Sequence, residues 1–177
     1  MSAAPSYPPL SPGLTVHDAA AAIDFYKRAF RAEERYRLVD PESGKIGHAE
    51  LLINGALVML GEEYPQWNKS PRTLGGTAVR LGLMTADAQA QFNRAVEAGA
   101  EVVRPVTEEF YGHRSGRLRD PFGHEWIISQ ELKRMSPEEM QRRWNEMVAA
   151  PEDSAASVVL VVVLVAASIL ASSALAT

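Results

Sequence analysis

The sequence predicts an α+β fold in which two tandem βαβββ modules form a cleft. Three observations support this prediction. The order of strand-like and helix-like segments repeats along the chain, short residue matches recur in that order, and the charged part has the length of one domain. All 18 basic and 22 acidic residues precede position 155, and a domain typically has about 100–150 residues. The chain is therefore expected to hold one duplicated domain followed by an uncharged tail.

The first module is predicted from helical and strand periodicity and from turn residues. Asp18 is a natural N-cap, and the apolar residues after it recur at helical spacing. Asn54-Gly55 lies between two apolar runs and is the dipeptide typical of a type I′ hairpin turn. The predicted elements are a strand ending at Val16, a helix over 18–30, a strand over 33–39, a turn over 41–44, and a hairpin with strands over 47–53 and 56–60.

The second module repeats this order after a loop over 61–76. Asp87 opens its helix as Asp18 opens the first, and Gly99 ends it. The matches Ala32-Glu33 with Ala100-Glu101 and Ile46-Gly47-His48 with Tyr111-Gly112-His113 indicate a duplicated unit of roughly 60 residues. The predicted elements are strands over 77–84 and 101–106, a helix over 88–98, and a hairpin with strands over 117–119 and 125–129.

Three segments flank the domain, which is predicted to cover residues 10–131. Residues 1–9 are rich in proline and are expected to form a disordered leader. Ser136, Pro137 and Glu139 form the start of a capped amphipathic helix over 136–150. Its apolar face either packs on the domain or lies at a membrane surface.

Composition excludes several classes of function. The formal net charge is -4 and no basic cluster is present, whereas nucleic-acid binding needs grouped Lys and Arg. The chain has no cysteine, so disulfides, thiolate metal sites and cysteine nucleophiles are excluded.

Four motifs together resemble one known superfamily. The sequence is similar to the PhnB-like branch of the glyoxalase/bleomycin-resistance/extradiol-dioxygenase superfamily, also called vicinal oxygen chelate (VOC) proteins, over about residues 10–131. The resemblance implies two βαβββ modules whose curved sheets form a ligand cleft, and a homodimer in which a partner's module completes that cleft. The motifs are Leu14-Thr15-Val16-His17-Asp18 with Ala22-Ile23-Asp24-Phe25-Tyr26, His48-Ala49-Glu50-Leu51, Leu74-Gly75-Gly76-Thr77, and Tyr111–Gly116 with Asp120–Trp126.

The residues depart from the superfamily pattern where a metal ion would bind. Metal-using members hold a divalent ion with His and Glu side chains from the first and last strands of each module, and the ion acts on substrate oxygens. Residues 8–16 contain no His, residues 56–60 contain no acid, and residues 77–84 contain neither. We therefore expect no standard metal quartet, and a divalent metal remains an alternative. A second departure is Arg31, where the superfamily usually has a glycine at the left-handed end of the helix.

The candidate site residues lie on the predicted hairpins and loops. His48 and Glu50 are two residues apart and share one face of a strand. They could ligate a metal ion, act as an acid/base pair, or pair with neighbouring side chains. His113 is the third catalytic candidate. A ligand pocket combines apolar walls with a few polar groups, and the residues predicted to line it are Trp67, Arg80, Tyr111, Arg114 and Trp126.

Structural roles are also open for several of these residues. Trp126 could belong to the core, and His113 could be held by hydrogen bonds within its loop. His17, beside a helix cap, is expected at the surface. His124, directly after a Pro-Phe-Gly turn, is expected to pack in that turn.

The uncharged tail, residues 155–177, predicts a membrane anchor. Val158–Ala176 comprises 19 uncharged residues, and a helix of that length spans ~28 Å, close to a bilayer core of ~30 Å. A tail anchor would leave the domain facing the cytosol. No Lys or Arg flanks the segment, so charge gives no orientation, and the alternative is a cytoplasmic soluble protein with an extension of another kind.

Three functions compete. The first is a protein that binds a small molecule in the inter-module cleft without the usual metal quartet, as bleomycin-resistance proteins do. The second is a metal-dependent lyase, isomerase or dioxygenase of the same superfamily. The third is a membrane-tethered interaction module without catalysis. The missing quartet favours the first and third, and the sequence does not identify the ligand.

Overall fold

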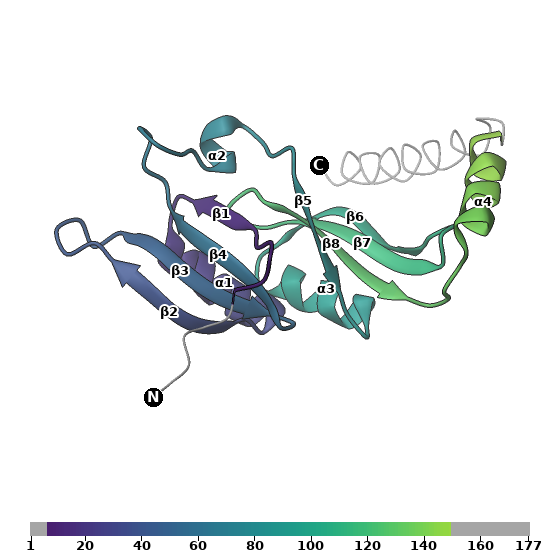
Figure 1. Cartoon of the computed structure of the whole chain (residues 1–177), viewed down its shortest axis with the longest axis horizontal. Helices are drawn as coiled ribbons and strands as arrows, with labels where there is room; N and C mark the ends of the chain where they lie inside the picture. The colour runs from purple at the N-terminus through teal and green to yellow at the C-terminus, as the bar shows by residue number, and fades with distance from the viewer. Residues whose placement is uncertain (1–6, 150–177) are drawn as a thin grey trace, which may run out of the picture. The chain divides into compact units, whose positions relative to one another are not determined.

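The structure is a computed structural model, and it describes residues 7–149. It contains two four-stranded sheets, one from each half of the chain, in the orders β1-β4-β3-β2 and β5-β8-β7-β6 (Figure 1). In both sheets the first strand of the module pairs in parallel with the last, and the other pairs are antiparallel. This confirms the predicted α+β fold of two tandem βαβββ modules.

The two modules carry the same elements in the same order. Module 1 comprises β1 (Gly13–Val16), α1 (Ala19–Phe30), β2 (Glu33–Val39), β3 (Ile46–Ile53) and β4 (Ala56–Glu62). The short α2 (Pro71–Leu74) lies in the connection. Module 2 comprises β5 (Arg80–Met84), α3 (Ala88–Glu97), β6 (Glu101–Glu108), β7 (His113–Arg119) and β8 (Glu125–Glu131).

Local sequence accounts for the helix ends. The Asp18 carboxylate accepts a hydrogen bond from the Ala21 N–H at 2.9 Å, and Asp87 accepts one from the Ala90 N–H at 3.0 Å, so both predicted N-caps are confirmed. Arg31 ends α1 in the left-handed conformation with φ 54° and ψ 38°. The chain thus uses a non-glycine residue at this cap and bears its modest steric cost.

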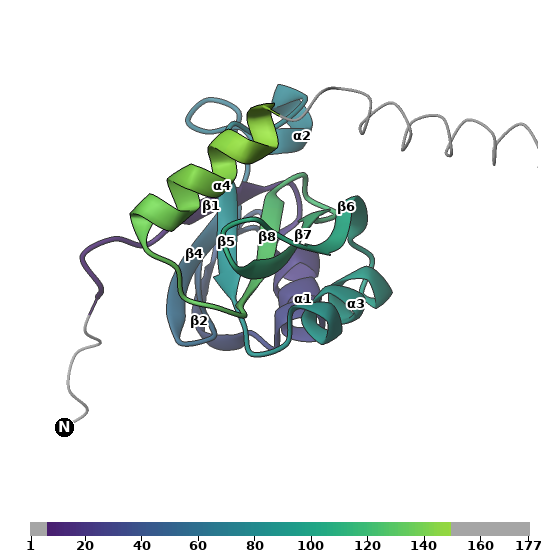
Figure 2. The ribbon, with the colours of Figure 1, turned by 90° about the vertical axis from the view of Figure 1, so that its right-hand side faces the viewer.

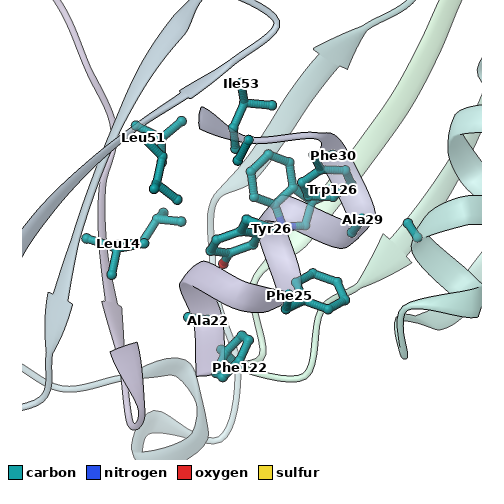
Figure 3. Packing of buried hydrophobic residues seen from close by; sticks show 14 of the residues in the cluster. Leu14, Ala22, Phe25, Tyr26, Ala29, Phe30, Leu51, Ile53, Phe122 and Trp126 are labelled. Atoms are coloured by element: carbon teal, nitrogen blue, oxygen red, sulfur yellow. The ribbon is translucent and has the colours of Figure 1, made fainter. Parts of the chain in front are cut away.

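A continuous core joins the two modules. Helices α1 and α3 lie side by side (Figures 1 and 2), and the Gln91 amide of α3 donates a hydrogen bond to the Ala29 carbonyl of α1 at 2.6 Å. Phe30 of module 1 packs on Trp126 of module 2 with ring centroids 4.6 Å apart (Figure 3). Both rings are almost fully buried, so the modules share one hydrophobic core.

Asp120 forms a buried hydrogen-bond centre at this junction. Its Oδ2 accepts hydrogen bonds from the Tyr26 hydroxyl at 2.7 Å and from the Trp126 indole N–H at 2.9 Å. Its Oδ1 accepts the backbone N–H groups of Phe122 and His124, each at 2.9 Å. Burial, and then the charge of Asp120, raise the pKa of Tyr26 well above its usual value, so Tyr26 stays a neutral donor.

The main differences from the predicted elements lie in module 2 and in the connection before it. Strand β5 begins at Arg80 rather than residue 77, because the Thr77 hydroxyl exchanges hydrogen bonds with the backbone of Val79 in a local turn. Strand β7 begins at His113 rather than residue 117, because it continues to pair with β8 as far as Glu131. Helix α2 lies inside the predicted loop.

The helix α4 (Pro137–Ala149) belongs to a separate unit that begins at Met135. The Ser136 hydroxyl accepts a hydrogen bond from the Glu139 N–H at 3.3 Å, as expected for an N-cap. The Glu139 carboxylate instead accepts from Arg142 and Arg143. No residue of α4 is buried.

The predicted tail anchor, 155–177, and most of the leader, 1–6, lie outside the described residues. Within residues 7–149, no helix is both long enough and apolar enough to cross a membrane.

The Asp120 centre yields a stability prediction. Replacing Asp120 with Ala leaves buried donors without acceptors, and we expect a loss of about 3 kcal/mol or more in the free energy of unfolding. Tyr26→Phe removes one donor together with its bond and should cost about 1 kcal/mol. Urea unfolding of the two variants tests this ranking, and an equal loss from both would contradict it.

Candidate functional site

One face of each sheet packs against a helix. We call the opposite face, which no helix of the module covers, the open face. Side chains alternate across a strand. In β3, Leu51 and Ile53 point into the core beside α1 (Figure 3), so Glu50 and Leu52 belong to the open face of module 1. In β7, a Cβ atom on Gly116 would lie 2.6 Å from the Phe92 ring of α3. Ser115 and Arg117 therefore belong to the open face of module 2.

Glu50 is the centre of a polar cluster on the open face of module 1. Its side chain is 1% exposed. Oε1 accepts a hydrogen bond from the Tyr36 hydroxyl at 2.7 Å and lies 3.5 Å from His48 Nε2. Oε2 lies 2.9 Å from Arg35 Nη1, but it has no hydrogen bond of good geometry. The cluster thus holds a carboxylate with one oxygen only partly satisfied.

The surroundings of Glu50 decide its charge. Burial alone would raise its pKa, but hydrogen bonds from Tyr36, Tyr7 and His48, with the charge of Arg35, outweigh burial and lower the pKa below the usual 4.5. The pKa of Tyr36 is raised, first through its interaction with Tyr7 and then by the hydrogen bond to Glu50. Glu50 is therefore an anion at neutral pH, and Tyr36 is a neutral donor.

The end of the leader borders this cluster. The Arg35 guanidinium lies 5.9 Å from the centre of the Tyr7 ring. A shallow cavity of about 510 Å³ lies between residues 7–12 on one side and Arg35, Leu52 and Leu57 on the other. The open face of module 1 therefore combines a charged centre with an apolar border.

The open face of module 2 carries a second polar cluster around Ser115, which is fully buried. The Ser115 hydroxyl donates to Glu109 Oε1 at 2.9 Å and accepts from Arg104 at 3.2 Å. Arg104 also forms an ion pair with Glu109. The Tyr111 hydroxyl lies 3.3 Å from the Ser115 hydroxyl.

His113 occupies the end of the same strand. Its Nδ1 lies 3.0 Å from the Ser129 hydroxyl, and its ring centroid lies 5.2 Å from that of Tyr111. The open face of module 2 thus presents an imidazole, hydroxyl groups and guanidinium groups.

A pocket between the modules is a separate feature. It has a volume of about 360 Å³ and is lined by residues 12–15 of module 1, residues of the connection, and Leu81 and His124 of module 2. The His124 ring nitrogen Nε2 lies 3.1 Å from the Thr15 carbonyl, so this side chain helps to hold the modules together.

The side chains do not fit the metal site of the metal-using members. Within the part of the chain that the structure describes, no group of three His, Asp or Glu residues could hold a metal ion. His48 and Glu50 supply two donors, and Glu50 is already engaged by Arg35 and Tyr36. The donor set therefore does not match such a site.

The structure separates the residues that were predicted to line one pocket. Trp126 is 3% exposed and lies in the core, where its N–H is bound by Asp120. Trp67 is 80% exposed in the connection and packs against Tyr64. Arg80 pairs with Glu125 and Arg114 pairs with Glu108. Of the predicted pocket residues, Tyr111 joins the Ser115 cluster, and Arg80 lies on the same open face, where its partner Glu125 also binds Arg119.

The predicted catalytic candidates fall on both open faces, His48 and Glu50 on one and His113 on the other. The sequence reasoning missed Arg35, Tyr36 and Ser115. Tyr36 and Glu50 are directly opposed across β2 and β3. That register includes a bulge at Arg35, and nothing in the sequence alone fixes a bulge.

Comparison with known proteins decides the family. The model of the Glyoxalase/Bleomycin resistance protein/Dioxygenase superfamily matches residues 10–128. The chain belongs to this superfamily. The resemblance on which the sequence analysis relied is therefore confirmed, and the two open faces are those of a VOC domain.

Three known proteins illustrate what this chain is similar to. An uncharacterized protein of Mycobacterium tuberculosis is 45% identical over 138 residues, which cover 76% of this chain and 81% of that protein. The crystal structure of TioX from Micromonospora sp. ML1 matches with a TM-score of 0.56 and 29% identity, over 70% of this chain and 98% of TioX. A PhnB protein from Bacillus cereus, 17% identical with a TM-score of 0.54 over 70% of this chain and 99% of that one, shares the fold.

The lowered pKa of Glu50 predicts how stability depends on pH. Because folding favours the carboxylate, its contribution is present above pH 4.5, the usual pKa of Glu, and is lost as pH falls through the lower folded value. The difference in unfolding free energy between the wild type and Glu50→Gln should therefore shrink below pH 4.5. Urea unfolding between pH 3 and pH 7 measures it, and a difference that grows towards low pH would contradict the assignment.

Proposed function

We propose that this VOC protein binds a small molecule in a cleft between open faces of its modules, and that it does so without the usual metal quartet. The observation that carries the proposal is the ionised, almost fully buried Glu50 on a sheet face that α1 does not cover. Burying a carboxylate is costly unless it has partners, and this fold supplies Arg35, Tyr36 and His48. A carboxylate held in this way can bind a polar group of a ligand.

The border of the Glu50 cluster supports the same function. Small-molecule sites combine apolar walls with a few placed polar groups. Leu52 and Leu57 provide apolar walls beside Arg35, in a cavity of about 510 Å³. The ligand would donate a hydrogen bond to Glu50 Oε2, which has no hydrogen-bond partner, and place its apolar part against the leucines.

A second copy of the chain completes the cleft in this proposal. Within one chain the two modules are joined through α1, α3 and Asp120, and an open face without a facing sheet leaves its ligand half covered. Exposed apolar residues at the sheet edges, where association between copies is favoured, support a homodimer: Leu38 and Val39 in β2, Met84 in β5, and Val102 and Val103 in β6.

The alternative enzyme rests on the His48–Glu50 pair. A metal-dependent lyase, isomerase or dioxygenase would need at least one further ligand from another chain or from the substrate. Metal content therefore discriminates between a binding protein and such an enzyme.

Ligand-dependent stabilisation tests the proposed function. A library of small molecules is screened by thermal unfolding of the full chain. A ligand at 100 times its Kd should stabilise the protein by about 2.7 kcal/mol. We expect Glu50→Gln to weaken the binding of such a ligand at least tenfold.

Glu34→Gln is the matched control. Glu34 is also ion-paired, with Lys27 and Arg37, but it lies opposite Leu51 in the register and so faces the helix side. Equal weakening by both variants would contradict a site at Glu50. Stoichiometric metal in the purified protein, lost in Glu50→Ala, would favour the enzyme instead.

The membrane-tethered alternative is tested by flotation with liposomes. If residues 155–177 insert, the full chain should float with the vesicles, whereas a chain ending at Pro151 should stay in the dense fraction. Equal partition of the two chains would contradict the anchor.

A further inference from the structure

Arg117 lies on the open face of module 2, and none of the residues that the structure describes serves as its counterion. It is half-buried at the middle of β7, and its Nε is fully buried with no hydrogen-bond acceptor. Within residues 7–149 it forms no ion pair and donates no hydrogen bond. The other arginines of the same sheet are all paired: Arg80 and Arg119 with Glu125, Arg104 with Glu109, and Arg114 with Glu108.

The duplicated position in module 1 has the opposite arrangement. In the strand register, Glu50 lies opposite Tyr36, the residue directly after the first bulge of β2. Arg117 likewise lies opposite Arg104, the residue directly after the first bulge of β6. In module 1 the bulged residue is Arg35, which neutralises Glu50. In module 2 the bulged residue is Val103, which offers no charge. The fold therefore balances the charge at one of the two equivalent positions and leaves it unbalanced at the other.

The neighbours of Arg117 do not supply an anion. Across the strands it faces Arg104 and Ile127. The carboxylates of the same face are engaged elsewhere, Glu109 by Arg104 and Ser115 and Glu125 by Arg80 and Arg119. A guanidinium that is partly removed from water without a partner is unfavourable, so this position is suited to an anion that comes from outside the module.

The groups around Arg117 fit an oxyanion. A guanidinium binds carboxylate or phosphate oxygens through two parallel N–H donors. The Ser115 and Ser129 hydroxyls lie two residues further along the same face and are opposed across β7 and β8. The His113 ring lies beyond them. The Ser115 proton is already donated to Glu109, so the guanidinium is the principal donor, and Ser129 and His113 are polar groups further along the face.

We propose that Arg117 binds the anionic group of the small molecule in the cleft, a carboxylate or a phosphate. This inference rests on the proposed function and adds to it the chemical class of the ligand. The source of the anion is a small molecule rather than an acidic side chain of a second copy, because Arg117 lies on the inner strand β7, whereas the exposed apolar residues that favour association between copies lie on the edge strands β5 and β6.

The first test compares two arginine variants of the full chain without ligand. Arg117→Met removes an uncompensated charge, so the Tm should stay unchanged or rise. Arg104→Met removes a paired charge and leaves Glu109 without its cation, so the Tm should fall. An equal fall in both variants would show that Arg117 has a structural counterion, which would overturn the proposal.

The second test adds anions. The Tm of the wild type is followed with sodium phosphate and with sodium acetate, each against sodium chloride of equal ionic strength. At least one oxyanion should raise the Tm saturably, and the oxyanion that does so gives the class of the group. Arg117→Met should weaken this binding at least tenfold, and Arg117→Lys, which keeps the charge without the fork, should weaken it less.

Three outcomes would overturn the proposal. One is the absence of any oxyanion effect in the wild type, and another is an equal effect in wild type and Arg117→Met. The third is a change of sedimentation in Arg117→Met towards smaller species, which would assign the counterion to a second copy. A neutral ligand that depends on Glu50 but not on Arg117 would leave the proposed function intact and contradict only this assignment.

Discussion

The structure depends on the buried carboxylate of Asp120, which ties the two modules into one body. It accepts hydrogen bonds from Tyr26 of module 1, from Trp126 of module 2 and from the backbone of the β7–β8 turn. Without a shared acceptor, the Tyr26 hydroxyl and the Trp126 N–H would be buried without partners, which is costly. Asp120 thus provides the acceptor for buried donors of both modules and fixes the turn before β8.

This junction also determines which surfaces remain available for function. The core between the modules uses α1, α3 and the aromatic rings around Tyr26, as seen in Figure 3. Because those elements cover one face of each sheet, the polar side chains of β3 and β7 are left on the other face. The binding potential of this VOC protein therefore follows from how its modules are joined.

The duplicated modules have diverged most clearly in charge. In module 1 the bulged residue is Arg35, and the residue opposite the next position is Glu50. In module 2 the bulged residue is Val103, and the residue opposite the next position is Arg117. A buried charge needs a partner, and only module 1 supplies it internally. The two open faces thus differ in charge balance at equivalent positions.

Local signals in the sequence were sufficient for the fold. The caps at Asp18 and Asp87 and the turn at Asn54-Gly55 depend on residues close in the chain, and they were predicted from it. Only the structure established the left-handed end at Arg31. The start of β7 was not predicted, because its first residues are held by β8 rather than by their own pattern. The sequence also pointed to His48, Glu50 and His113 without indicating which residues surround them.

The sequence by itself determined the module order, the family and the absence of cysteine chemistry, since these follow from composition, spacing and motifs. The tertiary structure decided which side chains meet. It placed Trp126 in the core with Asp120, brought Arg35 and Tyr36 to Glu50, and left Arg117 without a partner among residues 7–149. The physical reason is that strand register and bulges set the contacts across a sheet, and a shift of one residue moves a side chain to the opposite face.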